Sequence, residues 1–506
     1  MRRALVVCLA VVLSAEVARA ALLRGTPRSD VLAGTPAVDK IDALAGNDRI
    51  STGWDDKPDV VNCGTGRDVL NADGRDTFLN CEAVAHRLSR DTNTDWEAQH
   101  ATQVEPDSFA FGSKVVTAFQ NGRYQEGGAA AIGWATSGNA GKTWRAGTLA
   151  QTRYGLVSDP VVAYDTIHRT WLITALGATP TTVELWVSRS ADGFAWSAPI
   201  VAAADPDVNY DKEWLACDNG VSSVYRGRCY LAYVDFATEM LDVQRSDDGG
   251  RTWTKPVRLK PAATGRVAFT GPMPVVRPDG MLVIPYVVFG GNGDEVAAVV
   301  SQDGGETFSP PLHISSLSFE NDTDLRSEAM PSVDVDTDGK LYLVWSDARF
   351  REEGANDILM STSQDGFRWT TPVRIPLTAR AAGVEMNYVL PAIAVAPGSG
   401  GNNAKLAVAV YSERLQNGCA TFLPGCSKQV DAWLVRSKDG GKKWSAPKLL
   451  SAEPMPLQWL ADTTRGRMLG DYVSVSWAGG KPWAVMPLAT QSALGFSEAV
   501  FAATAS

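Results

Sequence analysis

The sequence predicts an all-β protein, a β-propeller of seven or six blades with a small β-roll-like domain at its N-terminal side. Three observations predict this fold. A short motif recurs six times at widely spaced positions, runs of β-branched residues precede each copy, and an aspartate recurs every nine residues near the start of the 506-residue chain. With 45% hydrophobic residues, the chain can form a large core and a smaller module.

The recurring motif is seen most fully in "SDDGGRTW", which begins at Ser246. Successive copies are 53 to 74 residues apart, a distance that suits four short strands per repeat. Each copy is expected in the turn between the third and fourth strands. The copies begin at Ser137, Ser190, Ser246, Ser301, Ser363 and Ser437.

Seven strand starts accompany the six motif copies. After the sixth copy, the chain still offers three strands without a motif, and residues 95–103 are expected to add a fourth and close the ring. Seven blades are therefore favoured over six. The first strands are expected to begin near Glu105, Asp159, Glu213, Pro272, Glu328, Tyr388 and Tyr472.

The motif itself is expected to be structural. Its glycines permit a positive φ, its aspartate can accept hydrogen bonds from amides of the turn, and its tryptophan can pack between repeats. The pattern S-x-D-x-G-x-T-W resembles the Asp-box, or BNR repeat, of sialidases and their relatives. That resemblance implies a sialidase-like fold over residues 95–506, with the active site on the face opposite the boxes.

Residues 22–90 have the different, nine-residue period. Aspartates recur there, each followed two residues later by an aliphatic residue, and glycines and aspartates in "GTGRD" suit a tight turn with oxygen ligands for Ca²⁺. The segment resembles the haemolysin-type (RTX) calcium-binding repeats. A β-roll that binds few ions and serves stability or secretion is the alternative. The expected calcium ligands are Asp30, Asp39, Asp48, Asp59 and Asp68.

Residues 1–20 have the charged, apolar and small-residue order of a secretory signal peptide, and the apolar run is too short to span a bilayer. We therefore expect a secreted, extracellular and monomeric product without a membrane span. Three disulfides are predicted from the remaining cysteines. The expected pairs are Cys63 with Cys81, Cys217 with Cys229 and Cys419 with Cys426.

The formal net charge of −10 argues against a nucleic-acid partner, and four histidines without a CxxC motif argue against a zinc site. The starts of the first strands and the ends of the second strands should instead bring carboxylates and arginines together in one funnel. Crowded carboxylates raise one another's pKa, and nearby arginines keep other carboxylates ionised. One site can therefore contain both an acid and a base. The substrate-binding candidates are Glu105, Arg123, Asp211, Glu213, Trp214 and Asp471.

The sialidase resemblance implies specific catalytic residues. Glu328 matches the glutamate that activates a tyrosine nucleophile, and Tyr472 matches that tyrosine. Arg349 and Arg414 match two arginines of the triad that binds the substrate carboxylate. The first inner strand carries Glu105 where the family has the first arginine of the triad, so an acidic funnel should accept neutral sugars, or cationic or metal-bridged ligands, more readily than sialic acid.

The predicted function is that of a secreted, calcium-binding, sialidase-like protein that acts on extracellular glycans or glycoproteins as an exo-glycosidase. A non-catalytic module that presents the same funnel to a glycan or protein ligand is the alternative. The expected organisation is a signal peptide over residues 1–20, calcium-binding repeats over 22–90 and the sialidase-like domain over 95–506.

Overall fold

The computed structural model describes residues 20–151, 153–260, 267–290, 293–351, 354–377, 386–415, 428–492 and 495–505. These residues are organised almost entirely as strands, with two 3₁₀ turns, η1 (Gly401–Asn403) and η2 (Leu457–Trp459), and no α-helix. Within these ranges no helix has the length and apolar character needed to cross a membrane. The predicted signal peptide, residues 1–20, lies outside the described residues except for Ala20.

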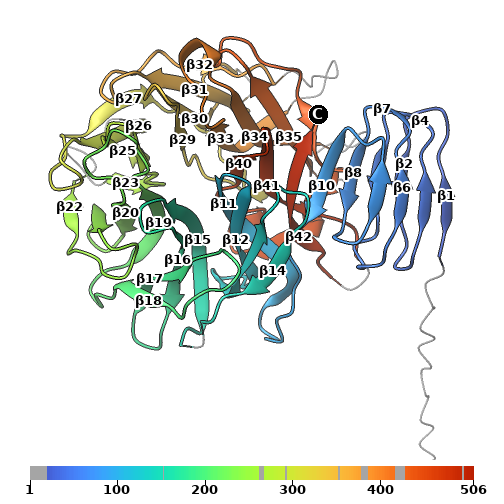
Figure 1. Cartoon of the computed structure of the whole chain (residues 1–506), viewed down its shortest axis with the longest axis horizontal. Coiled ribbons are helices and arrows are strands. Elements are labelled where there is room, and N and C mark those ends of the chain that lie inside the picture. The colour runs from blue at the N-terminus through green and yellow to red at the C-terminus, as the bar shows by residue number, and fades with distance from the viewer. Residues whose placement is uncertain are drawn as a thin grey trace, which may run out of the picture.

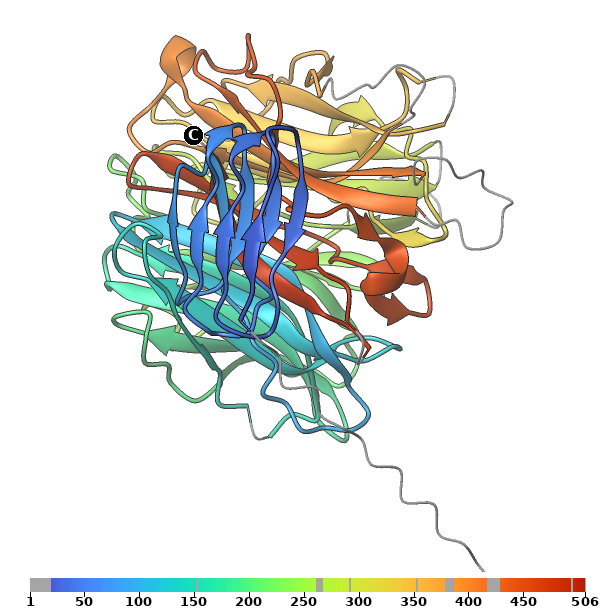
Figure 2. The same cartoon turned by 90° about the vertical axis from the view of Figure 1, so that its right-hand side faces the viewer.

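The N-terminal region is a β-solenoid of stacked coils (Figures 1 and 2). Parallel strands follow the orders β1-β3-β6-β9 and β2-β5-β8-β10, and a short pair, β4 with β7, joins two turns. The strands are β1 (Leu22–Arg24), β2 (Val31–Ala33), β3 (Lys40–Asp42), β4 (Ala45–Gly46), β5 (Arg49–Ser51), β6 (Val60–Asn62), β7 (Thr65–Gly66), β8 (Val69–Ala72), β9 (Thr77–Leu79) and β10 (Ala83–Arg87).

The nine-residue period explains this arrangement. Successive nine-residue segments alternate between the two sheets, so that Leu22 pairs with Lys40 and Val31 pairs with Arg49, one full coil further on. The aliphatic residue two places after each aspartate points inward, and Ile41, Ile50 and Val61 are completely or almost completely buried. This line of side chains is the core of the solenoid.

The C-terminal region consists of antiparallel sheets whose first strands lie nearest its centre (Figure 1). The first three groups of four consecutive strands comprise β11 (Gln99–Phe111), β12 (Lys114–Arg123), β13 (Ala129–Ser137), β14 (Arg145–Thr148), β15 (Leu156–Asp165), β16 (Thr170–Ala178), β17 (Val183–Ser190), β18 (Ile200–Ala203), β19 (Tyr210–Cys217), β20 (Cys229–Asp235), β21 (Met240–Ser246) and β22 (Val257–Leu259).

The next sheets have the same antiparallel order, and large apolar clusters pack between neighbouring sheets. They comprise β23 (Val267–Thr270), β24 (Val275–Val276), β25 (Leu282–Gly290), β26 (Glu295–Ser301), β27 (Leu312–Ser316), β29 (Ser332–Val335), β30 (Leu341–Asp347), β31 (Asp357–Ser363), β32 (Val373–Arg374), β33 (Asn387–Val395), β34 (Leu406–Leu415), β35 (Lys428–Ser437), β36 (Lys448–Leu449) and β37 (Met455–Pro456).

The last strands connect the C-terminal region to the solenoid. A small sheet has the order β28-β39-β38, and β40, β41 and β42 follow one another in antiparallel pairs. Strand β42 then pairs with β10 in a register of five residues, from Ala83 with Ala505 to Arg87 with Phe501. These strands are β28 (Leu325–Arg326), β38 (Ala461–Thr463), β39 (Gly466–Met468), β40 (Ser474–Ala478), β41 (Lys481–Ala489) and β42 (Glu498–Ala505).

The predicted β-propeller is therefore wrong as a fold class, although the protein is all-β as expected. The structure has a β-solenoid of stacked coils in place of a closed propeller with an appended roll. Residues 95–103 do not supply the fourth strand after β40, β41 and β42, because β10 of the solenoid takes that place and β11 contacts β42 through one residue pair, Thr102 with Glu498. One continuous sheet of fifteen strands consequently joins the solenoid to the C-terminal region (Figure 1).

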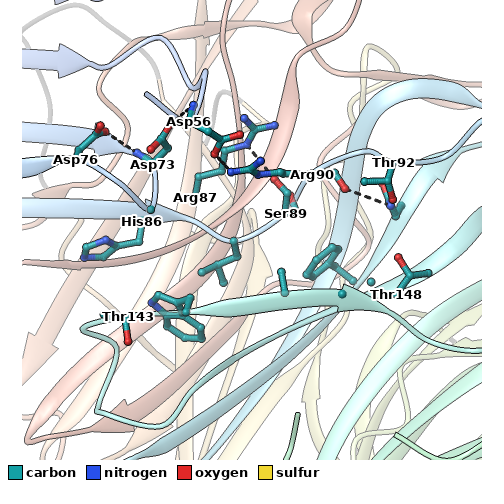
Figure 3. Close-up of a pocket in the computed structure, with 18 of the residues that line it drawn as sticks. Asp56, Asp73, Asp76, His86, Arg87, Ser89, Arg90, Thr92, Thr143 and Thr148 are labelled. Atoms are coloured by element: carbon teal, nitrogen blue, oxygen red, sulfur yellow. Dashed lines mark hydrogen bonds and ion pairs between the residues drawn. The ribbon is translucent and has the colours of Figure 1, made fainter. Parts of the chain in front are cut away.

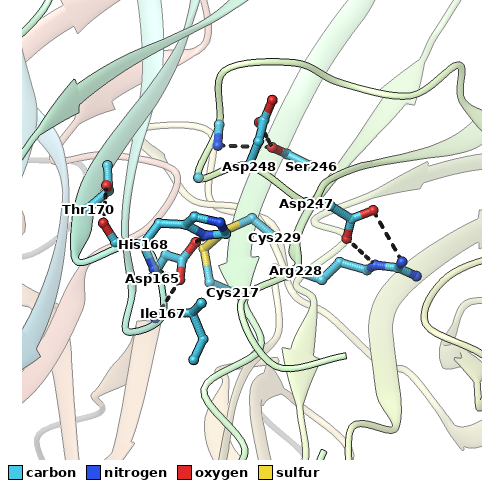
Figure 4. Close-up of polar contacts among 12 residues, drawn as sticks. Asp165, Ile167, His168, Thr170, Cys217, Arg228, Cys229, Ser246, Asp247 and Asp248 are labelled. Carbon is cyan, nitrogen blue, oxygen red and sulfur yellow. Dashed lines mark hydrogen bonds and ion pairs between the residues drawn. A yellow bond between two sulfur atoms is a disulfide. The ribbon is translucent and has the colours of Figure 1, made fainter. Parts of the chain in front are cut away.

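The repeated motif lies where the sequence predicts it, in the turns between third and fourth strands. In the third copy, Ser246 Oγ donates to Asp248 Oδ1 at 2.9 Å and accepts from the amide of Gly250 at 2.9 Å (Figure 4). The Asp248 carboxylate also accepts from the amide of Thr252 at 3.0 Å and from its hydroxyl at 2.7 Å. These contacts confirm that the motif stabilises a turn.

Two of the three predicted disulfides are present. Cys63 bonds to Cys81 at the end of the solenoid, and Cys217 bonds to Cys229 across β19 and β20. The second disulfide lies beside the turn that carries Asp165 and His168, whose ring Nδ1 is 2.6 Å from Asp165 Oδ2 (Figure 4). The third predicted pair, Cys419 with Cys426, lies outside the described residues.

Candidate active site

Three charged residues occupy strained backbone positions at the centre of the C-terminal region. The φ angles are 50° at Glu105, 51° at Asp159 and 53° at Lys212, and each residue lies at an irregularity in the register of a first strand, β11, β15 or β19. The equivalent irregularity in β33 has Leu390, with a φ of 54°. Left-handed backbone is costly for residues with a side chain and is concentrated at functional sites, so this position is a candidate site.

The innermost contacts form an ionic cluster around Asp471, which is 1% exposed. Arg326 Nε donates to Asp471 Oδ1 at 2.8 Å, and Lys212 Nζ donates to Asp471 Oδ2 at 2.5 Å. Burial acts to raise the pKa of Asp471, but the two cations outweigh it and hold that pKa well below its ordinary value. Asp471 is therefore an ionised carboxylate.

Lys212 connects this carboxylate to two others. Its Nζ atom lies 3.8 Å from Asp159 Oδ2 and 3.8 Å from Asp211 Oδ1. Burial acts to lower the pKa of Lys212, yet the surrounding carboxylates, with Asp211 and Asp471 first among them, hold it well above its ordinary value. Lys212 is thus the central cation of the cluster.

Glu105 lies on the opposite side of Asp471 and has the character of a neutral acid. Its Oε1 accepts from the amide of Asp471 at 3.1 Å, and its Oε2 accepts from Gln120 Nε2. Arg123 Nη1 in turn donates to Gln120 Oε1 at 2.8 Å. Burial, with added repulsion from Asp159 and Asp471, raises the pKa of Glu105 to about 8.

Glu213 is the second buried acid. It is 1% exposed, and neither of its carboxyl oxygens has a hydrogen-bond partner. Burial raises its pKa well above the ordinary value, with repulsion from Asp159 as the next cause. An unpartnered ionised carboxylate would be very costly in such surroundings, so Glu213 is held in the protonated form.

Trp214 and Tyr472 form the aromatic part of the site. Their rings meet edge to face with centroids 5.1 Å apart, and the hydroxyl of Tyr472 donates to the carbonyl of Pro160 at 3.1 Å. Burial raises the pKa of Tyr472 well above its ordinary value, with repulsion from Asp159 and Glu105 as the next causes. The phenol is therefore protonated and bonded to the backbone.

Asp211 and Glu328 lie where the cluster reaches solvent. The Asp211 side chain is 34% exposed, and the Glu328 side chain is 19% exposed and pairs with Arg465 at 3.1 Å. Burial raises the pKa of Asp211 to about 6, while Lys212 opposes that rise. Both carboxylates act on Lys212, so they lie near the same buried cation.

The structure brings most of the predicted site residues together but leaves two arginines elsewhere. Arg349 bonds to Asp347 at the end of β30 and to Ser315 Oγ at 2.9 Å. Arg414 lies 3.4 Å from Asp431, which also pairs with Arg49 of the solenoid at 2.6 Å. The predicted residues found at the central cluster are Glu105, Arg123, Asp211, Glu213, Trp214, Glu328, Asp471 and Tyr472.

Lys212 and Arg326 are important members of the cluster that sequence reasoning missed. Lys212 stands between Asp211 and Glu213, and Arg326 is two residues before Glu328, so both adjoin predicted residues. The sequence signal that could have identified Lys212 is a positive charge between two candidate acids. The pairing of Arg326 with Asp471 depends on two distant segments, and no local pattern indicates it.

The solenoid aspartates use their carboxylates to link successive coils. The amide of Asp30 donates to Asp48 Oδ1 at 2.8 Å, and the amide of Asp48 donates to Asp68 Oδ1 at 2.8 Å. A second line has the same pattern, in which the amide of Asp39 donates to Asp59 Oδ1 at 2.7 Å. These five hydrogen-bonded aspartates form what we term the aspartate ladder.

The ladder offers a calcium ion few side-chain ligands. The Oδ2 atoms of Asp48, Asp59 and Asp68 are buried without a hydrogen-bond partner and so are available. Within the part of the chain that the structure describes, however, no three His, Cys, Asp or Glu side chains gather as a metal-binding group. A bound calcium ion would therefore depend on these single carboxylate oxygens together with backbone carbonyls.

Two cavities lie away from the central cluster. One, of about 730 Å³, lies between the solenoid and the sheet that contains β12 and β13. The other, of about 690 Å³, lies beside β18 and β22 and is lined in part by Tyr210, Tyr233 and Trp253. We place the candidate chemistry at the central cluster and not in these two cavities, because the cluster contains the acids in strained backbone and the carboxyl groups of different protonation state.

The repeated turns and the antiparallel sheets define a class of protein built from BNR repeats. Residues 179–456, more than half of the chain, match the BNR repeat-like domain, and the chain belongs to that family. A comparison with curated proteins gives no significant match.

Several solved structures are similar at low sequence identity. Penicillium chrysogenum α-L-arabinanase, solved with arabinobiose, is 15% identical with a TM-score of 0.43, and the match covers 64% of this chain and 93% of that chain. A polysaccharide lyase, an ulvan lyase, is 11% identical with a TM-score of 0.44 over 77% and 92%. Trypanosoma rangeli sialidase, solved with the inhibitor DANA, is 13% identical with a TM-score of 0.40 over 84% and 60%.

Proposed function

We propose that the protein is an exported glycan-acting enzyme, an exo-glycosidase whose active site is the cluster around Lys212. The observation that carries the proposal is the convergence of acids from several distant segments, three of which present charged residues in left-handed backbone. A protonated acid and an ionised carboxylate in one site are what glycoside hydrolysis requires. Membership of the BNR repeat-like family supports this class of function.

Asp211 is the proton donor in this proposal. Its pKa of about 6 lets it hold a proton in mildly acidic solution, and its partly exposed side chain can reach a bound sugar. Asp211 gives its proton to the leaving oxygen as the glycosidic carbon–oxygen bond breaks. Lys212 stabilises the carboxylate that remains.

Glu328 is the second carboxylate. It is held by Arg465 and lies near the same lysine, so it can accept a proton from the water that attacks the sugar carbon. The water oxygen forms the new bond to that carbon, and the two carboxyl groups return to their starting states by exchange with solvent. The surrounding neutral acids, Glu105 and Glu213, keep additional negative charge out of the buried cluster.

The test measures release of product from aryl glycosides, sialosides included, by residues 21–506. We expect Asp211→Asn and Glu328→Gln to lower kcat/KM by about a hundredfold or more. Asp207→Asn, an exposed aspartate near the same strand, is the matched control and should retain activity. Hydrolysis that survives both site substitutions would refute this assignment.

Tyr472→Phe separates this mechanism from the one that the sialidase resemblance implies. The Tyr472 hydroxyl is bonded to a backbone carbonyl, so its removal should change kcat/KM by only a few fold. Loss of all activity in Tyr472→Phe together with Glu328→Gln would support a tyrosine nucleophile instead.

A non-catalytic glycan-binding protein is the second candidate. The positions of Arg349 and Arg414 favour it over an ordinary sialidase, because these two arginines are bonded to Asp347 and Asp431 and not to residues of the cluster that contains Tyr472. Binding of glycans without turnover of any glycoside in the panel would support this candidate and refute the enzyme.

We also propose that the solenoid binds calcium after export. Burial raises the pKa of Asp59 to about 7, so the folded solenoid holds a proton that the unfolded chain releases above about pH 4. Stability from this group is present at low pH and is lost as the pH rises towards 7. Calcium should therefore raise the melting temperature at pH 8 more than at pH 5, relative to EDTA. Identical melting in calcium and EDTA at pH 8 would refute the proposal.

A further inference from the structure

The cavity between the solenoid and the C-terminal region has the size of a ligand-binding pocket. Its volume is about 730 Å³, within the usual range of about 300–1,000 Å³ for such sites. One wall comes from the end of the solenoid, around Asp73 and Asp76, and from β10. The other comes from β13 and the first Asp-box, with Thr143 on that side (Figure 3).

Aromatic rings follow one another across this junction. Phe78 lies 5.8 Å from His86, His86 lies 6.0 Å from Trp483, and Trp483 lies 6.4 Å from Trp144, measured between ring centroids. Phe78, His86 and Trp144 line the cavity and are at least partly exposed. Such rings offer flat apolar faces, with polar edges, to a ligand.

The charges of the cavity are balanced. The acidic residues Asp56, Asp73 and Asp76 face the basic residues Arg87, Arg90 and Lys142, three against three. Most of these groups are already committed, because Arg90 pairs with Asp56 and Arg87 donates to the carbonyls of Trp54 at 2.7 Å and Ser89 at 2.9 Å. An anionic or cationic ligand would gain little from this lining.

Polar groups suited to hydroxyls remain at the walls. Thr143 Oγ1 accepts from Asn139 at 2.9 Å and keeps its own hydrogen for donation. Burial lowers the pKa of His86 to about 4, so the neutral ring can both donate and accept.

We infer that this junction cavity binds a neutral oligosaccharide, with sugar rings against Phe78, His86 and Trp144. Aromatic faces with hydroxyl-bonding groups and no net charge match the chemistry of a neutral sugar, which has apolar C–H faces and many hydroxyls. The inference rests on the proposed glycan-acting role only for the class of ligand. The site is separate from the cluster around Lys212, so it would hold a glycan chain on the enzyme without cleaving it.

The test is calorimetric titration of the full exported chain with neutral xylohexaose, cellohexaose and arabinohexaose. An Asp211→Asn background prevents hydrolysis during the measurement. We expect binding of at least one hexasaccharide, and a loss of affinity of tenfold or more in Phe78→Ala and in Trp144→Ala. Trp196→Ala, the equivalent tryptophan of the second Asp-box, is the matched control and should bind as before.

Three outcomes would overturn the inference. These are the absence of binding to all three hexasaccharides, unchanged affinity in both aromatic variants, and tighter binding of an anionic hexagalacturonate than of the neutral sugars. If Trp144→Ala fails to fold by circular dichroism, Trp144→Phe and Phe78→Leu give the same comparison with smaller losses. Binding that persists while the Asp211-containing protein hydrolyses nothing would support this site and refute the proposed enzyme.

Discussion

Lys212 is the residue whose removal tests the central cluster most directly. Its ammonium is 2.5 Å from Asp471 and 3.8 Å from both Asp159 and Asp211. Lys212→Met keeps a similar side-chain volume but leaves three carboxylates with Arg326 as the remaining close cation on Asp471. We expect this substitution to destabilise the protein in a way that depends on pH.

The magnitude follows from the distances. At about 4 Å and an effective dielectric constant of about 20, one charge pair is worth about 4 kcal/mol. Loss of one partner from a buried ion pair costs about 3–5 kcal/mol. For a protein of this size that corresponds to a fall in melting temperature on the order of 3–5 °C at pH 8.

Asp211 gives the pH dependence its sign. Its pKa is already raised to about 6 and Lys212 opposes the rise, so Lys212→Met should raise it by a further one to two units, roughly, once solvent screening is included. A raised folded-state pKa means that stability is present at low pH and is lost as the pH rises through that pKa. The difference between wild type and variant should therefore be larger at pH 8 than at pH 5, where the variant still lacks the ion pair with Asp471.

Thermal melts from pH 5 to pH 8 measure this difference. Lys405→Met, at an exposed position, is the matched control and should melt like the wild type at every pH. An equal fall in melting temperature at pH 5 and pH 8, or no fall at all, would refute the electrostatic account of the cluster.

Three further substitutions test the rest of the molecule. Arg49→Leu removes an ion pair and a 2.9 Å hydrogen bond between the solenoid and the C-terminal region. It should lower the free energy of unfolding in urea by about 2–3 kcal/mol. An equal loss in Arg24→Leu, at the far end of the solenoid, would contradict this. Asp248→Ala should lower the free energy of unfolding by about 1–2 kcal/mol at pH 7 and by less near pH 2. The reason is that the pKa of Asp248 is lowered to about 2, and its hydrogen bonds are lost as the carboxylate takes up a proton. A cost that does not change with pH would contradict this prediction. Replacement of both Cys217 and Cys229 by alanine should cost about 2–3 kcal/mol through loss of a short loop closure, and an unchanged urea midpoint would show that the disulfide adds nothing.

Local sequence patterns predicted the features that depend on neighbouring residues. The Ser246 turn depends on hydrogen bonds within a few residues, so its motif was sufficient to place it between two strands. The nine-residue period likewise predicted stacked coils, because the inward position of Ile41 or Ile50 repeats with the chain. What the aspartates do could not be predicted, since the carboxylates of Asp48 and Asp68 accept hydrogen bonds from backbone amides one coil earlier in the chain.

Features that depend on contacts between distant segments could not be predicted from the sequence. The pairing of β10 with β42 joins opposite ends of the chain, and the expected closure by residues 95–103 failed for that reason. Arg349 and Arg414 were assigned to the site from the sialidase resemblance, but in the structure they form ion pairs with Asp347 and Asp431. The predicted strand starts put Glu105 and Asp471 close together, as the structure does, because the start of a strand depends on its local sequence.

The pairing of β10 with β42 also affects when the protein can finish folding. Ala83 is synthesised long before its partner Ala505. The solenoid can stack its own coils at once, but the exposed edge of β10 stays open until the whole C-terminal region has emerged. Truncation of the last strand would therefore leave a complete solenoid whose β10 edge is unpaired. Premature termination of synthesis would then lead to aggregation instead of a stable fragment.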